Sequence, residues 1–167
     1  MSRTTTFREL FEAEHYGGGI RNGNALKMFI PGGASAPWFF PEQVDLPLEG
    51  RVVGGEGSML GSGAIVVMDE TTDAVRACLR VVRFFARESC GKCAPCREGT
   101  SWEEKILQRI LDGNGRPSDI DLLLDVADNI SPGPYPTAAH PDAGLDAVPF
   151  PPRQTTICPL GPSSVAP

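Results

Sequence analysis

The sequence contains no long hydrophobic run, no excess of basic residues and very little histidine. No stretch of about 18 apolar residues is present, so no membrane-spanning helix is encoded. The balance of 15 Lys and Arg against 21 Asp and Glu leaves a net charge of −6, which argues against nucleic acid as a partner. The two histidines provide little for hydrolytic catalysis. Residues 1–6 also lack an apolar signal region, and we therefore expect a cytoplasmic protein.

Cysteine is the residue type whose placement is most informative. The chain has five cysteines, an odd number, and Cys90, Cys93 and Cys96 repeat every three residues. This is a poor disulfide framework and a better metal site in a reducing compartment. Because a helix interior does not tolerate proline, Pro95 predicts a loop that turns these sulfurs toward one centre. Clustered thiolates bind iron–sulfur clusters or zinc.

A cubane cluster needs a fourth ligand, and none follows nearby, since position 100 is threonine. Cys78 lies on the apolar stripe of a predicted helix, where a buried, inert thiol is the usual finding. Cys158 lies in a loop context and is followed by Pro159. The sequence therefore predicts four metal ligands: Cys90, Cys93, Cys96 and Cys158.

The charges around the loop favour an anionic centre. Arg87, Lys92 and Arg97 flank the cysteines, although Glu88 and Glu98 partly offset them. The helix predicted after the loop would direct its N-terminal amides toward the sulfurs. A structural zinc site is the alternative, but it usually shows two cysteine pairs. A thioredoxin-like site has no place for the third cysteine, and the spacing is wrong for a radical enzyme that uses S-adenosylmethionine.

Hydrophobic periodicity predicts a small α+β region followed by antiparallel helices. The expected elements are a helix at 6–14, strands at 26–30 and 64–68, and helices at about 71–87, 99–112 and 118–130. The second strand is mostly apolar, so we expect it to be buried on both faces. The glycines between 54 and 63 predict a flexible turn with close backbone packing, because their spacing and context do not fit a dinucleotide-binding loop.

Residues 131–154 break this pattern. Seven of these 24 residues are proline, which predicts an extended connection or an insertion. We therefore expect four parts, namely residues 1–70, 71–130, 131–154 and 155–167.

Specific caps and core positions also follow from the pattern. Thr71 or Thr72 is expected to cap the helix that precedes the cysteines, and Ser118 with Asp121 resembles a capping box. The later helices are expected to direct the following residues inward: Trp102, Ile106, Ile110, Ile120, Leu123, Leu124, Ala127 and Ile130.

Residues 88–100, Glu-Ser-Cys-Gly-Lys-Cys-Ala-Pro-Cys-Arg-Glu-Gly-Thr, resemble the iron–sulfur segment of the NADH- and FMN-binding F subunit of respiratory complex I, an NADH–quinone oxidoreductase. Residues 157–161 resemble the segment that bears the last ligand of that family. Further resemblance is found at 6–10, 30–33, 57–64, 67–72 and 120–130.

The resemblance implies a ubiquitin-like β-grasp module of the soluble-ligand-binding type, followed by a helical bundle that carries one [4Fe–4S] cluster. By position, its ligands would be the same four cysteines. In that family the cluster passes single electrons from reduced FMN to further clusters on partner subunits. The family's FMN- and NADH-binding domain has no counterpart here, so this chain is not expected to oxidise NADH alone.

The same resemblance implies partners and a location. We expect a flavin domain and other iron–sulfur subunits as partners, with peripheral attachment at the cytoplasmic face of the inner membrane through them. An NAD-linked hydrogenase or a formate dehydrogenase could be the host instead. A non-redox reading also stays open, in which a four-cysteine metal site only staples an interaction surface and residues 131–154 contact the partner.

Overall fold

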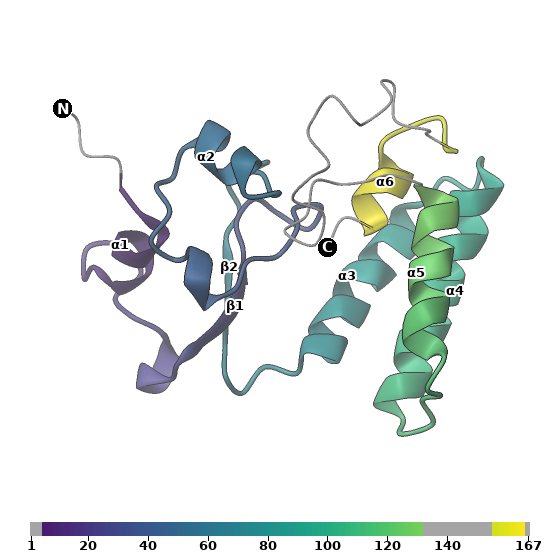
Figure 1. Cartoon of the computed structure of the whole chain (residues 1–167), viewed down its shortest axis with the longest axis horizontal. Helices are drawn as coiled ribbons and strands as arrows, with labels where there is room; N and C mark the ends of the chain where they lie inside the picture. The colour runs from purple at the N-terminus through teal and green to yellow at the C-terminus, as the bar shows by residue number, and fades with distance from the viewer. Residues whose placement is uncertain (1–4, 132–154, 166–167) are drawn as a thin grey trace. The chain divides into compact units, whose positions relative to one another are not determined.

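The computed structural model describes residues 5–131 and 155–165, and Figure 1 traces the chain. The chain divides into two compact units, residues 1–72 and residues 73–167. Within the described ranges, no helix is both long and apolar enough to cross a membrane. Most of the predicted proline-rich segment 131–154 lies outside the described residues.

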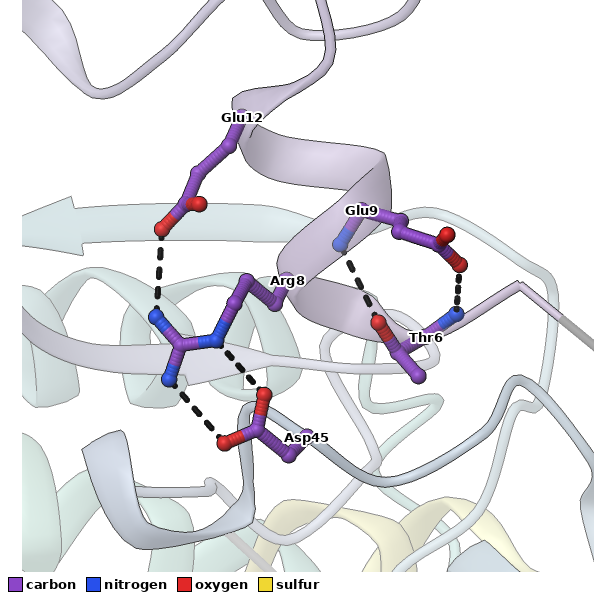
Figure 2. A network of polar contacts seen from close by, with 5 residues as sticks. All are labelled: Thr6, Arg8, Glu9, Glu12 and Asp45. Atoms are coloured by element: carbon purple, nitrogen blue, oxygen red, sulfur yellow. Dashed lines mark hydrogen bonds and ion pairs between the residues drawn. The ribbon is translucent and has the colours of Figure 1, made fainter.

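The first unit begins with α1 (Phe7–Glu12), which Thr6 caps (Figure 2). The Thr6 hydroxyl accepts the Glu9 amide at 3.1 Å, and the Glu9 carboxylate accepts the Thr6 amide at 3.2 Å, which completes a capping box. Arg8 donates to both carboxylate oxygens of Asp45, at 2.6 and 3.0 Å, and to Glu12 at 3.2 Å. These contacts fix the start of the helix and attach it to a distant loop.

The sheet of this unit has two strands. The predicted strand β1 (Leu26–Ile30) pairs antiparallel with β2 (Val66–Asp69), with Phe29 opposite Val67. The rings of Phe7 and Phe29 lie 4.9 Å apart between centroids, within the range of favourable aromatic pairs. The buried core of the unit consists of Phe7, Phe11, Phe29, Phe39, Val44 and Val53. The first unit is therefore a mixed α and β structure, as the sequence predicted.

The expectation that the second strand is buried on both faces is wrong. Val66 and Val67 are 45% and 39% exposed, and Met68 alone in this strand is buried. The apolar run reflects the β propensity of valine, because no described element of the unit covers the other face of β2.

The glycine-rich region contains one helix that the sequence did not predict, α2 (Gly50–Gly55). Glycine is a poor helix former, which hides this element from propensity arguments. The predicted close backbone packing is present further along the turn. A Cβ on either Gly32 or Gly61 would collide with the backbone of the other segment, so both positions require glycine. Two short 3-10 helices, η1 (Arg21–Gly23) and η2 (Pro41–Gln43), complete the unit.

The second unit is helical. It consists of α3 (Ala74–Glu88), α4 (Ala94–Leu111), α5 (Asp119–Ile130) and the short α6 (Leu160–Val165). Helices α4 and α5 run side by side in Figure 1, joined by a short turn. Gly99 makes this packing possible, because a Cβ there would lie 2.5 Å from the Cδ1 atom of Ile130.

Two of the predicted caps are wrong. Asp73, rather than Thr71 or Thr72, caps α3 by accepting the Arg76 amide at 3.0 Å. Both threonine hydroxyls donate instead to Asp69 at the end of β2.

At α5, Ser118 makes no capping bond with its side chain. The buried carboxylate of Asp119 accepts the Arg116 amide at 2.9 Å and two bonds from the Arg109 guanidinium. The Arg109 bonds, followed by the Arg116 amide, hold the pKa of Asp119 below its usual value.

The predicted inward faces of the later helices are partly wrong. Trp102 is 53% exposed, and Glu103 is buried one position further along. Ile120 and Leu124 are also exposed, because α5 is oriented by the Asp119–Arg109 contact and by Val126 and Ile130. Ile106 and Ile130 are buried as predicted, and Leu123 packs against the core formed by Leu79, Val82 and Leu107.

Candidate metal centre

The cysteine segment is a loop only in its first half. Helix α4 begins at Ala94, with Cys93 as its N-cap and Pro95 in its first turn. The prediction that Pro95 keeps residues 90–96 out of a helix is therefore wrong. Proline is tolerated in the first turn because its missing N–H has no partner there in any case. Two consequences follow: Cys96 is carried by the helix, and free amides of the first turn surround Cys93.

The three clustered thiols differ in burial. Cys90 is exposed, Cys93 is half-buried and Cys96 is buried. The Cys96 sulfur lies 3.5 Å from the hydroxyl of Ser89. The preceding turn is held by Arg97, which donates to the Gly91 carbonyl at 2.9 Å, while Gly91 has a φ of +77° that favours glycine. Arg97 also forms an ion pair with Glu98 at 2.7 Å.

The segment that carries Cys158 lies beside the first cysteines. The amide of Ile157 donates to the Cys93 sulfur at 3.3 Å, across 64 positions of sequence. Helix α6, which begins two residues after Cys158, packs on α3, α4 and α5. Gly161 allows this approach, because a Cβ there would lie 2.7 Å from Thr156. The fold therefore brings the remote cysteine into the neighbourhood of the loop.

The four thiols do not form a closed ligand set in these positions. Among the described residues, no three Cys, His, Asp or Glu side chains are grouped closely enough to hold a metal ion. The chemistry of the donors nevertheless fits an iron–sulfur cluster. Four thiols are available around one helix start, and a backbone amide already donates to one of the sulfurs. Amides directed at cluster sulfurs are a recognised way to tune such centres.

Cys78 lies apart from this group. It packs half-buried against the core of the helical unit. Burial, followed by the charge of Glu103, raises the pKa of the Cys78 thiol to about 11. Its thiolate form is therefore strongly disfavoured, which is the property expected of an inert structural cysteine.

Glu103 is the notable residue that the sequence reasoning missed. It lies in the middle of α4 and is 5% exposed, and its Oε2 atom has no hydrogen-bond partner among the described residues. Burial raises the pKa of this carboxyl to about 7. The spacing of Cys96, Thr100, Glu103 and Leu107 along one helix face could have revealed it.

Known protein families match the helical unit. The NADH-ubiquinone oxidoreductase-F iron–sulfur binding region matches residues 76–135, which supports an iron–sulfur cluster at this site. Three of the four proposed ligands lie within that range.

Relatives with similar sequences carry one name. The NADH-quinone oxidoreductase F subunit of Mycobacterium tuberculosis is 50% identical over 125 residues, which are 75% of this chain and 27% of that protein. The F subunit of Streptomyces coelicolor is also 50% identical, over 126 residues. The F subunit of Rickettsia felis is 42% identical over 118 residues. The chain thus spans about a quarter of the length of these relatives.

Among solved structures, an NAD⁺-reducing [NiFe]-hydrogenase in its H₂-reduced state shares the fold. Its TM-score is 0.70 at 22% identity, and the match covers 98% of this chain and 23% of that one. Over three quarters of its length the chain is therefore a relative of the F subunit of NADH-quinone oxidoreductase, and its residues 76–135 belong to the iron–sulfur binding region of that family.

Proposed function

We propose that the chain is the electron-transfer portion of an NADH–quinone oxidoreductase, with one [4Fe–4S] cluster held by Cys90, Cys93, Cys96 and Cys158. The observation that carries this proposal is the contact between the Ile157 amide and the Cys93 sulfur, which supports Cys158 as the fourth ligand. The match of residues 76–135 to the iron–sulfur region supports the type of centre.

The residues around the sulfurs have distinct tasks in this proposal. The cluster, when bound, accepts and releases single electrons. The Ile157 amide and the first-turn amides of α4 place positive dipoles beside the thiolates, which stabilises negative charge there. Arg97 holds the Gly91 turn and thereby the loop that carries Cys90. The buried Thr100 donates to the Cys96 carbonyl at 2.8 Å and rigidifies the first turns of the helix.

The electrons would come from a reduced flavin on a separate domain or partner and pass to iron–sulfur centres of other subunits. No part of the sequence resembles the flavin- and NADH-binding domain of the F subunit, so we propose that the chain does not oxidise NADH alone. Its location would be cytoplasmic, at the membrane only through partner subunits.

The first unit would be a reduced β-grasp module over residues 1–70. Support comes from α1 packing through Phe7 against the sheet, and from the bridge between Phe29 and Phe39, which extends the sheet beside β1. The bundle would comprise residues 71–130, and residues 155–167 would supply the last ligand.

Reconstitution with iron and sulfide under anaerobic conditions tests the proposal. About four irons per chain and a broad visible absorption are expected. Cys158→Ala should lose the cluster, whereas Cys78→Ala, the matched control, should keep it. Stoichiometric zinc without a chromophore would support the interaction-module alternative and refute the redox role. Loss of the cluster in Cys78→Ala alone would show that the fourth ligand is wrong.

An NAD-linked hydrogenase is the second candidate host, because the fold is shared with an NAD⁺-reducing [NiFe]-hydrogenase. The sequence identity of 50% to a protein of the quinone-linked complex makes that complex the preferred host. Deletion of the gene separates the two hosts. Loss of NADH-dependent quinone reduction is expected, while loss of hydrogen-dependent NAD⁺ reduction would assign the chain to the hydrogenase.

A further inference from the structure

A row of arginines follows α3 outside its apolar face. Arg76, Arg80, Arg83 and Arg87 are spaced by four, three and four residues, which places their side chains along one side of the helix. At a rise of about 1.5 Å per residue the row extends for about 16 Å. Such a row is unusual in a chain with a net charge of −6.

These arginines line a groove between α3 and α4. The groove has a volume of about 450 Å³, and its other lining residues are Leu79, Gln108, Leu111 and Asp112. Its only carboxylate among the described residues belongs to Asp112, which accepts the Gln108 side-chain amide at 2.7 Å. The lining therefore carries four positive charges against one negative charge.

One arginine is held in place and three are free. Arg83 donates to Glu104 at 2.9 Å and to Gln108 at 2.6 Å. Arg76, Arg80 and Arg87 are exposed and form no ion pair with any residue in the described ranges. Like charges one turn apart repel each other, and α3 itself offers only Glu88 as an internal acid. The row is thus an unneutralised positive surface that an anionic partner would stabilise.

The dimensions favour a protein segment over a compact anion. A single phosphate or diphosphate spans only part of a row of about 16 Å, whereas about five residues of extended chain cover it at about 3.3 Å each. Guanidinium groups also bind carboxylates through paired hydrogen bonds, which suits Asp and Glu side chains.

We propose that this arginine groove is the docking site for an acidic segment of a partner protein. The groove ends beside the candidate metal centre, since Arg87 precedes Cys90 by three residues. The inference therefore deepens the proposed electron transfer and rests on it for its biological meaning: the segment would hold a redox partner next to the cluster.

An oligo-glutamate peptide with a fluorescent label is a suitable probe, and an oligo-glutamine peptide is its neutral reference. Binding to the full chain is measured by fluorescence anisotropy. Binding of oligo-glutamate alone is expected. It should weaken as salt rises from about 0.1 M to about 1 M, because the screening length falls from about 10 Å to about 3 Å.

The variant Arg76→Gln/Arg80→Gln should bind the acidic peptide about tenfold more weakly, since each exposed charge pair contributes up to about fivefold. The control Arg21→Gln/Arg51→Gln removes the same charge from exposed positions of the first unit and should bind within about twofold of the wild type. Equal weakening in both variants would overturn the proposal, because binding would then follow net charge alone. Displacement of the peptide by tripolyphosphate at much lower concentration would assign the groove to a compact phosphate ligand and also overturn it.

Iron content and visible absorption of the same samples separate this inference from the proposed function. A chain that assembles the cluster but shows no groove-dependent peptide binding refutes the docking site alone. A chain that binds the peptide through the groove but assembles no cluster refutes the redox role alone.

Discussion

Replacing Glu103 by leucine should stabilise the protein at and above neutral pH. The carboxyl is buried in the middle of α4, and its Oε2 atom has no hydrogen-bond partner among the described residues. Burial raises its pKa from 4.5 to about 7, so the folded state favours the protonated acid. A leucine side chain at this position would bury apolar surface in place of an unpaired polar group.

The magnitude follows from proton linkage. Below pH 4.5 the carboxyl is protonated in both the folded and the unfolded chain, and its titration has no effect on stability. Between pH 4.5 and about 7 the unfolded chain loses the proton while the folded chain retains it, so the free energy of unfolding falls as pH rises. The difference of between two and three pKa units corresponds to about 3 kcal/mol, lost in full by about pH 8.

Urea denaturation of the reduced chain, followed by far-UV circular dichroism at about pH 5 and pH 8, measures this effect. The leucine variant should exceed the wild type by about 3 kcal/mol or more at the higher pH, with a smaller gap at the lower pH. Asp125→Leu removes an exposed carboxylate from α5 and should change stability by about 0.5 kcal/mol or less. A wild type whose stability rises from pH 5 to pH 8, with a leucine variant that shows the same rise, would refute the assignment of Glu103.

Three further predictions concern packing, capping and thiol reactivity. Gly99→Ala should destabilise the protein by about 1–2 kcal/mol in a urea melt, because the collision with Ile130 outweighs the gain in helix propensity; Gly54→Ala, whose Cβ would meet nothing, is the control that should not destabilise. Thr6→Ala should cost about 1 kcal/mol through loss of the capping box, and an unchanged melt would mean that Thr6 does not cap α1 in solution. In the cluster-free chain at pH 8, iodoacetamide should modify Cys78 about a hundredfold more slowly than the exposed Cys90, as followed by mass spectrometry, because a pKa of about 11 leaves little thiolate. Equal rates at the two positions would contradict the burial of Cys78.

The elements with a clear hydrophobic period were predictable from the sequence. The strand at Leu26–Ile30 and the end of α5 at Ile130 occur as expected. The phase of α5 could not be predicted, because apolar residues lie on several sides of the helix, namely Ile120, Leu122, Leu123 and Leu124. The contact of Asp119 with Arg109 decides which side faces inward, and that contact depends on tertiary structure.

The candidate site was predictable in its residue types and less so in its local structure. The spacing of the cysteines pointed to a metal, whereas Pro95 was taken as a barrier to a helix that in fact begins one residue before it. The same sequence signal fits a loop and a first helical turn. Glu103 escaped notice because a carboxylate on an apolar face looks like a break in the pattern, and only the fold shows that it is enclosed.

The contact between Ile157 and Cys93 has a consequence for biosynthesis. It joins positions 64 residues apart, so the loop cysteines are translated long before the segment that reaches them. Until residues 155–165 have left the ribosome, a nascent chain lacks α6 and the amide that approaches the Cys93 sulfur. Exposed thiols such as Cys90 are then open to oxidation or to capture of the wrong metal. Delivery of iron and sulfide is therefore best timed after translation of this last segment, which makes the order of synthesis part of how the site is protected.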